Sequence, residues 1–90
     1  MSIQLEVGDL VVTKMWDNTE KVEICQYKGQ TGFLMYTLYM QNTAGILSSQ
    51  LERFIRCTES LPYSSKIIRK SSSEEYYSKI LETTNKVDKC

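Results

Sequence analysis

The sequence contains no histidine, and this absence removes a large group of functions. Histidine is the commonest general base and the commonest nitrogen ligand for metals in proteins. No Cys-x-x-Cys pair replaces it at a zinc site, because the three cysteines are Cys25, Cys57 and Cys90. A cysteine or serine activated by lysine or aspartate stays formally open, but no nucleophile elbow or phosphate-binding glycine loop accompanies one. We therefore predict a protein that is not an enzyme and that holds neither metal nor cofactor.

The sequence also predicts no disulfides and no signal peptide, and it contains no long apolar run. Three cysteines are an odd number at wide spacings, whereas disulfide frameworks usually have even counts. No apolar run approaches the roughly 18 residues that a membrane-spanning helix needs. Met1 is not followed by the basic and apolar regions of a signal peptide. The expectation is a cytoplasmic protein with free thiols and no membrane partner.

An excess of charge of either sign is missing as well. The 11 basic and 11 acidic residues give a formal net charge of zero. Domains whose affinity for nucleic acid depends on charge are usually plainly basic. One local basic cluster exists, formed by Lys66, Arg69 and Lys70. Together with stacking aromatic residues, this cluster would form a nucleic-acid-binding site, which is the alternative function. If the cluster instead lies on an edge strand, its lysines would discourage unwanted pairing with other strands.

Residues 5–57 are typical of β-structure. Short runs rich in Val, Ile, Thr and Tyr alternate with turn clusters such as WDNTEK and KGQTG, where Gly29 and Gly32 can take positive φ. The predicted strands are Leu10–Trp16, Lys21–Tyr27, Phe33–Met40, Gly45–Ser48 and Arg53–Cys57, with a 3₁₀ turn at Ser49–Leu51. Five short strands at this spacing favour a small barrel.

Two motifs carry a resemblance to a known fold family. The chain begins its β-region with VGDLVV and ends it with GILSSQLERFI, a strand, a helical turn and a closing strand. Over residues 5–57 it resembles the SH3-like barrels, which include Tudor and KOW-type modules. Chromatin-reading Tudor domains carry an aromatic cage. The aromatic residues here cannot be assigned to cage positions, so that function is not carried over; they are Trp16, Tyr27, Phe33, Tyr36 and Tyr39.

The composition changes after the predicted barrel. Residues 58–72 hold the single proline and many serines, and we predict that they form a connector between the barrel and the helix. Within this connector, Lys66–Lys70 are predicted to form a short edge strand. Residues 73–88 are predicted to form a helix, because Ser72 and Glu75 have capping-box spacing. Its apolar stripe consists of Tyr76, Tyr77, Ile80, Leu81, Thr84 and Val87. The domain division is therefore a barrel at 1–57, a connector at 58–72 and a helix at 73–88 on or beside the barrel.

The stretch Gly32–Met40, GFLMYTLYM, is apolar on both faces of the strand that it predicts. Alternation places Phe33, Met35, Thr37 and Tyr39 on one side and Leu34, Tyr36, Leu38 and Met40 on the other. The core is expected to contain Leu10, Val12, Val22, Ile24, Leu38, Ile46, Leu51, Phe54 and Ile55. The second face of the strand must be covered either by the C-terminal helix or by another protein, including a second copy of this chain.

The sequence thus predicts a mainly β protein, an SH3-like five-stranded barrel with one amphipathic helix, that binds a protein without catalysis. The residues expected to bind the partner are Trp16, Phe33, Tyr36, Tyr39, Tyr76 and Tyr77. Frequent Lys, Ile, Asn and Tyr are typical of AT-rich bacteria and their phages. By analogy of size and composition, the chain is expected to be a small regulator or inhibitor that occupies a partner's surface. Phage anti-defence proteins, anti-CRISPR proteins among them, are one such group.

Overall fold

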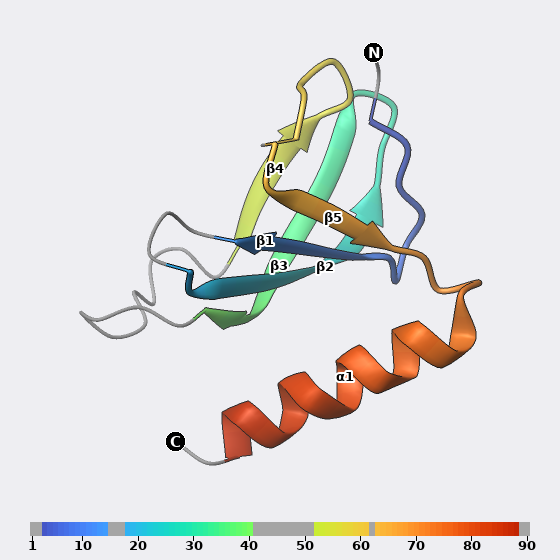
Figure 1. The fold of residues 1–90 in the computed structure, drawn as a ribbon. Coiled ribbons are helices and arrows are strands. Elements are labelled where there is room, and N and C mark those ends of the chain that lie inside the picture. The colour runs from blue at the N-terminus through green and yellow to red at the C-terminus, as the bar shows by residue number, and fades with distance from the viewer. Residues whose placement is uncertain (1–2, 15–17, 41–51, 62, 89–90) are drawn as a thin grey trace.

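The computed structural model describes residues 3–14, 18–40, 52–61 and 63–88. Five strands form one antiparallel sheet in the order β4-β3-β2-β1-β5 (Figure 1). They are β1 (Leu10–Lys14), β2 (Glu20–Lys28), β3 (Gly32–Met40), β4 (Glu52–Arg56) and β5 (Ser65–Ile68), and they are followed by helix α1 (Ser73–Asp88). The mainly β fold with a C-terminal helix is confirmed. No helix in the described part of the chain is long and apolar enough to cross a membrane.

The fifth strand lies in the segment that was expected to be a connector. Ser65–Ile68 pairs antiparallel with β1, and the Thr13 and Ser65 hydroxyls are 2.9 Å apart across this pairing. Lys66–Lys70 was predicted as an edge strand, and β5 is indeed an edge of the sheet. The predicted strand Gly45–Ser48 and the turn Ser49–Leu51 lie outside the described residues.

Two bulges between β2 and β3 change which side chains share a face. Val22 and Glu23 pair with Tyr39 and Thr37, so Leu38 is an extra residue on β3. A second register shift falls between Cys25 and Tyr27 on β2. Because a bulge reverses the alternation beyond it, Tyr39 does not share the face of Phe33 as strict alternation predicted.

The inner face of the curved sheet holds the first core. It is formed by Ile3, Leu5, Val11, Cys25, Phe33, Met35 and Ile55, with Cys57, Leu61 and Ile67 packed against it. The N-terminal segment is tied into this core, because Ile3 N donates to Cys57 O at 3.1 Å. Residues from β1, β2, β3 and β4 therefore converge on one interior.

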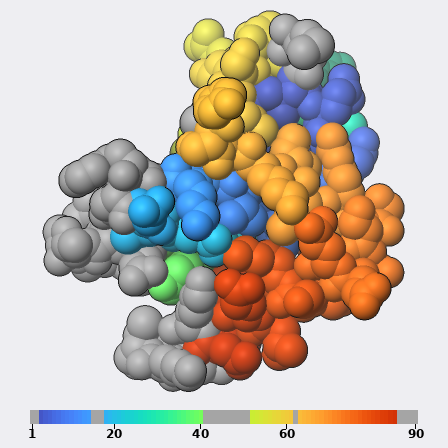
Figure 2. Space-filling model, in the orientation of Figure 1, coloured from blue at the N-terminus to red at the C-terminus, as the bar shows by residue number. Residues whose placement is uncertain are grey.

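Helix α1 covers part of the outer face of the sheet. A second core contains Leu10, Val12, Val22, Ile68 and Tyr76, with Ile24, Leu38, Tyr39 and Ile80 packed against it. The helix lies beneath the sheet in Figure 1, and in Figure 2 its side chains lie directly against those of β1 and β5. The helix therefore covers the part of the outer face that β1, β2 and the end of β3 provide.

Polar contacts hold the helix in this position. The Tyr76 hydroxyl donates to Gly8 O, and Lys79 Nζ lies 2.6 Å from Glu20 Oε1. Lys66 of β5 forms an ion pair with Glu75 at 2.9 Å. These contacts attach the helix to β2, to β5 and to the turn that precedes β1.

Asp9 organises the entry to β1. Its side chain accepts hydrogen bonds from Glu6 N at 2.9 Å, Lys70 N at 3.1 Å and Arg69 Nη1 at 2.9 Å. Burial alone would raise its pKa, but these bonds and the Arg69 charge hold the pKa of Asp9 below its ordinary value. The preceding Gly8 has φ of 99°, which only glycine adopts readily, so the chain can turn there just before β1.

Most of the predicted core is confirmed, and one member is wrong. Leu10, Val12, Val22 and Ile55 are buried, and Ile24 and Leu38 are partly buried. Phe54 is 51% exposed, because it points to the outer face of β4 beyond the reach of the helix. Ile46 and Leu51 lie outside the described residues.

Candidate partner-binding face

A set of large apolar side chains lies on the outer surface of β2, β3 and β4, away from α1. We call it the aromatic face, and it consists of Tyr27, Leu34, Tyr36 and Phe54. Leu34 is the cross-strand partner of both Tyr27 and Phe54, so these three side chains stand in one row. Tyr36 occupies the next outward position on β3, opposite Glu52. Tyr27 is 61% exposed, and Leu34 and Tyr36 are half-buried.

Gly29 in the β2–β3 turn and Gly32 at the start of β3 leave room for the aromatic rings at the end of this row. A Cβ on Gly32 would lie 2.7 Å from Phe54 Cζ and 2.2 Å from Ile55 O, and one on Gly29 would lie 3.0 Å from Tyr27 Cε1. Each ring therefore lies over a glycine backbone. These glycines were expected to supply positive φ, but among the described glycines only Gly8 has it. Their function here is to allow the close approach of a ring.

An open hollow of about 550 Å³ adjoins the Phe54 end of the aromatic face. It is lined by Gln30, Thr31, Phe54, Arg56, Cys57 and Thr58. Phe54 and Arg56 point outward together because they are two residues apart on β4. The hollow gives this end of the face both an apolar wall and an exposed guanidinium.

The opposite side of β4 is fixed by a buried ion pair. Arg53 Nε donates to Glu23 Oε2 at 2.7 Å, and Arg53 Nη2 donates to Glu23 Oε1 at 2.8 Å. The Glu23 side chain is 1% exposed, and Lys21 adds a second cation at 3.7 Å. The hydrogen bond from Arg53 to this carboxylate raises the pKa of the guanidinium further. A bidentate pair of this kind holds β4 rigidly behind the aromatic face.

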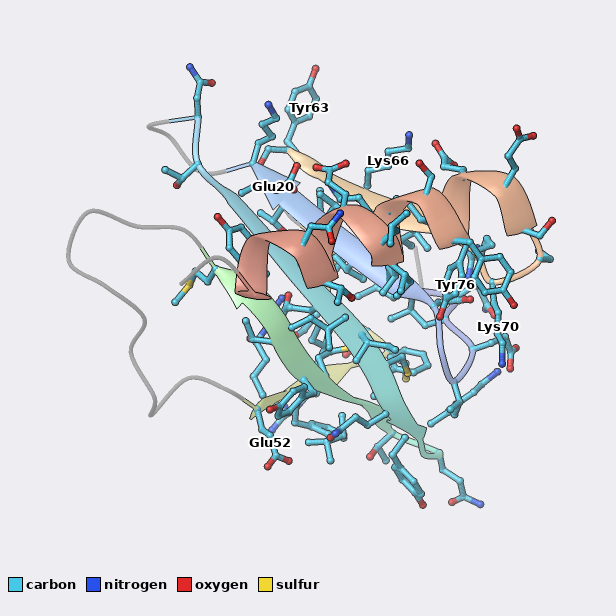
Figure 3. All side chains as sticks on the ribbon, turned by 90° about the horizontal axis from the view of Figure 1, so that it is seen from below. Glu20, Glu52, Tyr63, Lys66, Lys70 and Tyr76 are labelled. Carbon is cyan, nitrogen blue, oxygen red and sulfur yellow. The ribbon has the colours of Figure 1, made fainter. Side chains whose placement is uncertain are left out.

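Helix α1 has two unlike flanks beside its buried stripe. Glu75, Lys79 and Glu82 line a groove of about 350 Å³ together with Lys14, Glu20 and Lys66, among others. Tyr77 and Leu81, both 63% exposed, lie on the other flank, because Tyr76 and Ile80 face the sheet. Figure 3 shows Glu20 and Lys66 on one side of the helix and Glu52 on the other. The apolar flank therefore faces the side of the molecule that carries the aromatic face.

Comparison with known families gives one match, to the model described as the phage tudor domain, over residues 1–89. The chain belongs to the phage tudor domain family. No curated protein and no solved structure was found to match this chain. Membership confirms the expected resemblance to the Tudor type of SH3-like small barrel, and with it the fold class. Tudor-like domains are typically non-catalytic binding modules that bind proteins or nucleic acids.

Within the residues that the structure describes, the aromatic side chains of this phage tudor domain do not form a cage. Tyr27 and Tyr36 lie on the aromatic face, whereas Phe33 is in the interior core and Tyr39 packs against the core beneath α1. Trp16 lies outside the described residues. The bulge at Leu38 is one cause, since it turns Tyr39 toward the helix.

The partner-binding residues expected from the sequence are divided between surface and core. Tyr77 is exposed, whereas Tyr36 and Tyr39 are both half-buried, Tyr36 on the aromatic face and Tyr39 beneath α1. Phe33 and Tyr76 are corrected, because they are 3% and 6% exposed and have no surface to offer a partner. Sequence reasoning missed Phe54, which it assigned to the core, and Tyr27, whose face depends on the bulge in β2.

The basic cluster of the alternative function is largely engaged within the fold. Lys66 pairs with Glu75, and Arg69 donates to Asp9 and to Gln4 O. Lys70 is exposed, although its backbone N–H is bound by Asp9. Two of the three charges that would contact phosphates are therefore already compensated.

The described residues offer little reactive chemistry. Burial raises the pKa of the Cys25 thiol, which keeps it protonated and unreactive. Among these residues no three His, Cys, Asp or Glu side chains are grouped to hold a metal ion. What the surface does offer is exposed apolar area on Tyr27 and Phe54.

Proposed function

We propose that this phage tudor domain is a non-enzymatic module that binds another protein through the aromatic face. The observation that supports this proposal is the exposure of Tyr27 and Phe54 beside the half-buried Leu34 and Tyr36. The fold has a helix available to cover apolar strand surface, and it covers the other half of the outer face. Contiguous exposed apolar side chains of this size mark interaction surfaces.

The energetics of the aromatic face suit a binding site. Burying the exposed half of Tyr27 and of Phe54 would contribute about 1.5–3 kcal/mol in total, at roughly 1.5–3 kcal/mol for each complete burial. The Tyr27 and Phe54 rings lie close to Gly29 and Gly32, and a partner would contact the sides of the rings that face solvent. Aromatic residues form the energetic centre of many interfaces.

The role that fits such a module is occupation of a partner's surface. A small phage protein acting inside a bacterial cell in this manner would be a regulator or an inhibitor, of the anti-defence type to which anti-CRISPR proteins belong. Family membership supports the phage setting, and the aromatic face supports the mode of action. The expected partner presents an apolar patch that complements the row of Tyr27, Leu34 and Phe54.

The test is affinity capture from phage-infected host cells, compared between wild type and single variants. Tyr36→Ala and Phe54→Ala should each weaken recovery of the partner at least tenfold, while melting temperatures stay within a few degrees of wild type. Tyr63→Ala is the matched control, because Tyr63 is fully exposed and lies away from Glu52 in Figure 3. Equal recovery with wild type and both face variants would reject the proposal.

Nucleic-acid binding is the competing outcome. The ion pairs of Lys66 and Arg69 argue against it. The domain should therefore pass through DNA and RNA columns at about 50 mM salt, where a phosphate-binding protein is retained and released by added salt. Salt-sensitive retention that Lys70→Ala abolishes would favour nucleic acid instead.

A further inference from the structure

Strand β4 ends the sheet and has a hydrogen-bonded neighbour on one side only, within the described residues. Its sequence is Glu52-Arg53-Phe54-Ile55-Arg56, in which an acid and a base stand at equal distances from a central phenylalanine. We propose that two copies of this protein pair through the outer edges of their β4 strands, antiparallel, about a twofold axis at Phe54.

The backbone of β4 has the right hydrogen-bonding phase for this pairing. Cys57 N donates to Thr31 O at 3.0 Å, which makes that pair a hydrogen-bonded one on the β3 side. Because the pattern alternates along an antiparallel pair, Arg53 and Ile55 also direct their backbone groups toward β3. Glu52, Phe54 and Arg56 therefore direct theirs outward.

The outward groups match themselves across the proposed axis. Phe54 N would donate to Phe54 O of the second copy, and the reverse. Arg56 N would donate to Glu52 O of the second copy, again in both directions. Arg56 O already accepts from Glu59 N at 3.0 Å within its own chain, so it does not depend on the second copy. Glu52 N would face Arg56 O of the second copy, and a carbonyl oxygen can accept this second hydrogen bond beside the one from Glu59 N.

The side chains on the outer face match as well. This register sets Glu52 opposite Arg56 of the second copy, twice by symmetry, and Phe54 opposite Phe54. Both charged side chains are exposed, and neither forms an ion pair with a described residue. Opposite charges and aromatic pairs directly across a pairing stabilise it, and like charges destabilise it. A second copy is therefore the occupant whose charges complement this edge.

The inner face of the pairing contains no uncompensated charge. Arg53 would lie opposite Ile55 of the second copy, and its guanidinium is already held by Glu23. Short length and charged side chains usually discourage the pairing of an edge strand, and β4 has both. In the proposed register, however, each outward charge of β4 lies opposite a charge of the other sign, so these charges favour a second copy over other strands.

Pairing of this kind would join two aromatic faces into one surface with both Phe54 rings at its centre. This goes beyond the proposed function, because it concerns the oligomeric state and requires no partner. A dimer would present the proposed binding face twice, which raises avidity for a repeated target.

The test is sedimentation equilibrium of the full chain up to about 1 mM, with charge variants of β4. Wild type should show a concentration-dependent dimer. Glu52→Arg and Arg56→Glu should each raise the dimer dissociation constant about tenfold or more, because each places like charges opposite one another twice. The double variant Glu52→Arg/Arg56→Glu restores opposite charges and should restore the dimer. Glu59→Arg, a charge change just outside β4, is the control.

Amide exchange gives a second readout with the same chain. The N–H groups of Phe54 and Arg56 should become protected at dimer-forming concentrations, whereas those of Arg53 and Ile55 are protected at all concentrations. A wild type that stays monomeric at about 1 mM, a dimer unaffected by single reversals, or a double variant that is not rescued would each overturn the proposal. Partner capture is measured separately, so a failed dimer test leaves the proposed function standing or falling on its own data.

Discussion

At the scale of single residues, Asp9 connects segments that are far apart in the sequence. Its carboxylate accepts a hydrogen bond from Glu6 N in the N-terminal segment. It accepts two more from Arg69 Nη1 and Lys70 N, which lie just after β5. It is 2% exposed, so these bonds replace the water that it lost. An aspartate in a VGDLVV run predicts a turn, but its link to residues 69 and 70 depends on tertiary structure.

Asp9→Asn should lower the free energy of unfolding at pH 7 by about 1–3 kcal/mol, because it removes a charge-assisted acceptor. The folded-state pKa of Asp9 lies below the unfolded value of about 3.9. Its contribution is thus present above that pH and is lost as the pH falls through the folded pKa. Urea unfolding from pH 7 to pH 2 should show the difference between wild type and variant shrinking only below about pH 4. A difference that is constant with pH would contradict the assignment.

Phe54 and Ile55 give a matched pair of neighbouring residues on opposite faces of β4. Ile55→Ala should cost about 2–5 kcal/mol of stability, because Ile55 is 2% exposed in the interior core. Phe54→Ala should cost no more than about 1 kcal/mol, since half of its surface is already in water. Chemical denaturation measures both values. A larger loss for Phe54 than for Ile55 would mean that the faces of β4 are assigned the wrong way round.

At the scale of elements, strands and helix follow closely from the sequence, but their faces do not. Turn clusters and alternation place β1, β2, β3 and β4 within a residue or two of their observed bounds. The capping serines and glutamates place α1 at 73–88. The bulges of β2 and β3 depend on how the strands twist together, and the sequence carries no signal for them. The faces of Tyr27 and Tyr39 could therefore not be read from the sequence. Phe54 was expected in the core for a different reason, because the sequence does not show how much of the outer face α1 covers.

The attachment of α1 can be measured with two adjacent tyrosines. Tyr76 is buried and donates to Gly8 O, whereas Tyr77 is 63% exposed and contacts the Tyr76 ring edge-on. Tyr76→Ala should lower the free energy of unfolding by about 3 kcal/mol or more, and Tyr77→Ala by less than about 1 kcal/mol. Hydrogen exchange of the helix amides should accelerate strongly in the first variant only. Similar losses in both would show that the helix is not seated on the face of Tyr76.

At the scale of the whole molecule, two cores on opposite sides of one curved sheet account for most of the apolar residues. The sequence predicted that Gly32–Met40 needs cover on both faces, and the interior and α1 supply it for all but one region. That region is the aromatic face on β2, β3 and β4. It could not be located from the sequence, because the helix could have covered either half of the outer surface.

The most direct test of this account is the recovery of a bound protein from infected cells with Phe54→Ala set against Tyr63→Ala. The account predicts that the partner retained by wild type is also retained by Tyr63→Ala and is lost from folded Phe54→Ala. Retention by all three, at equal yield, would contradict the claim that the aromatic face is where this phage tudor domain binds.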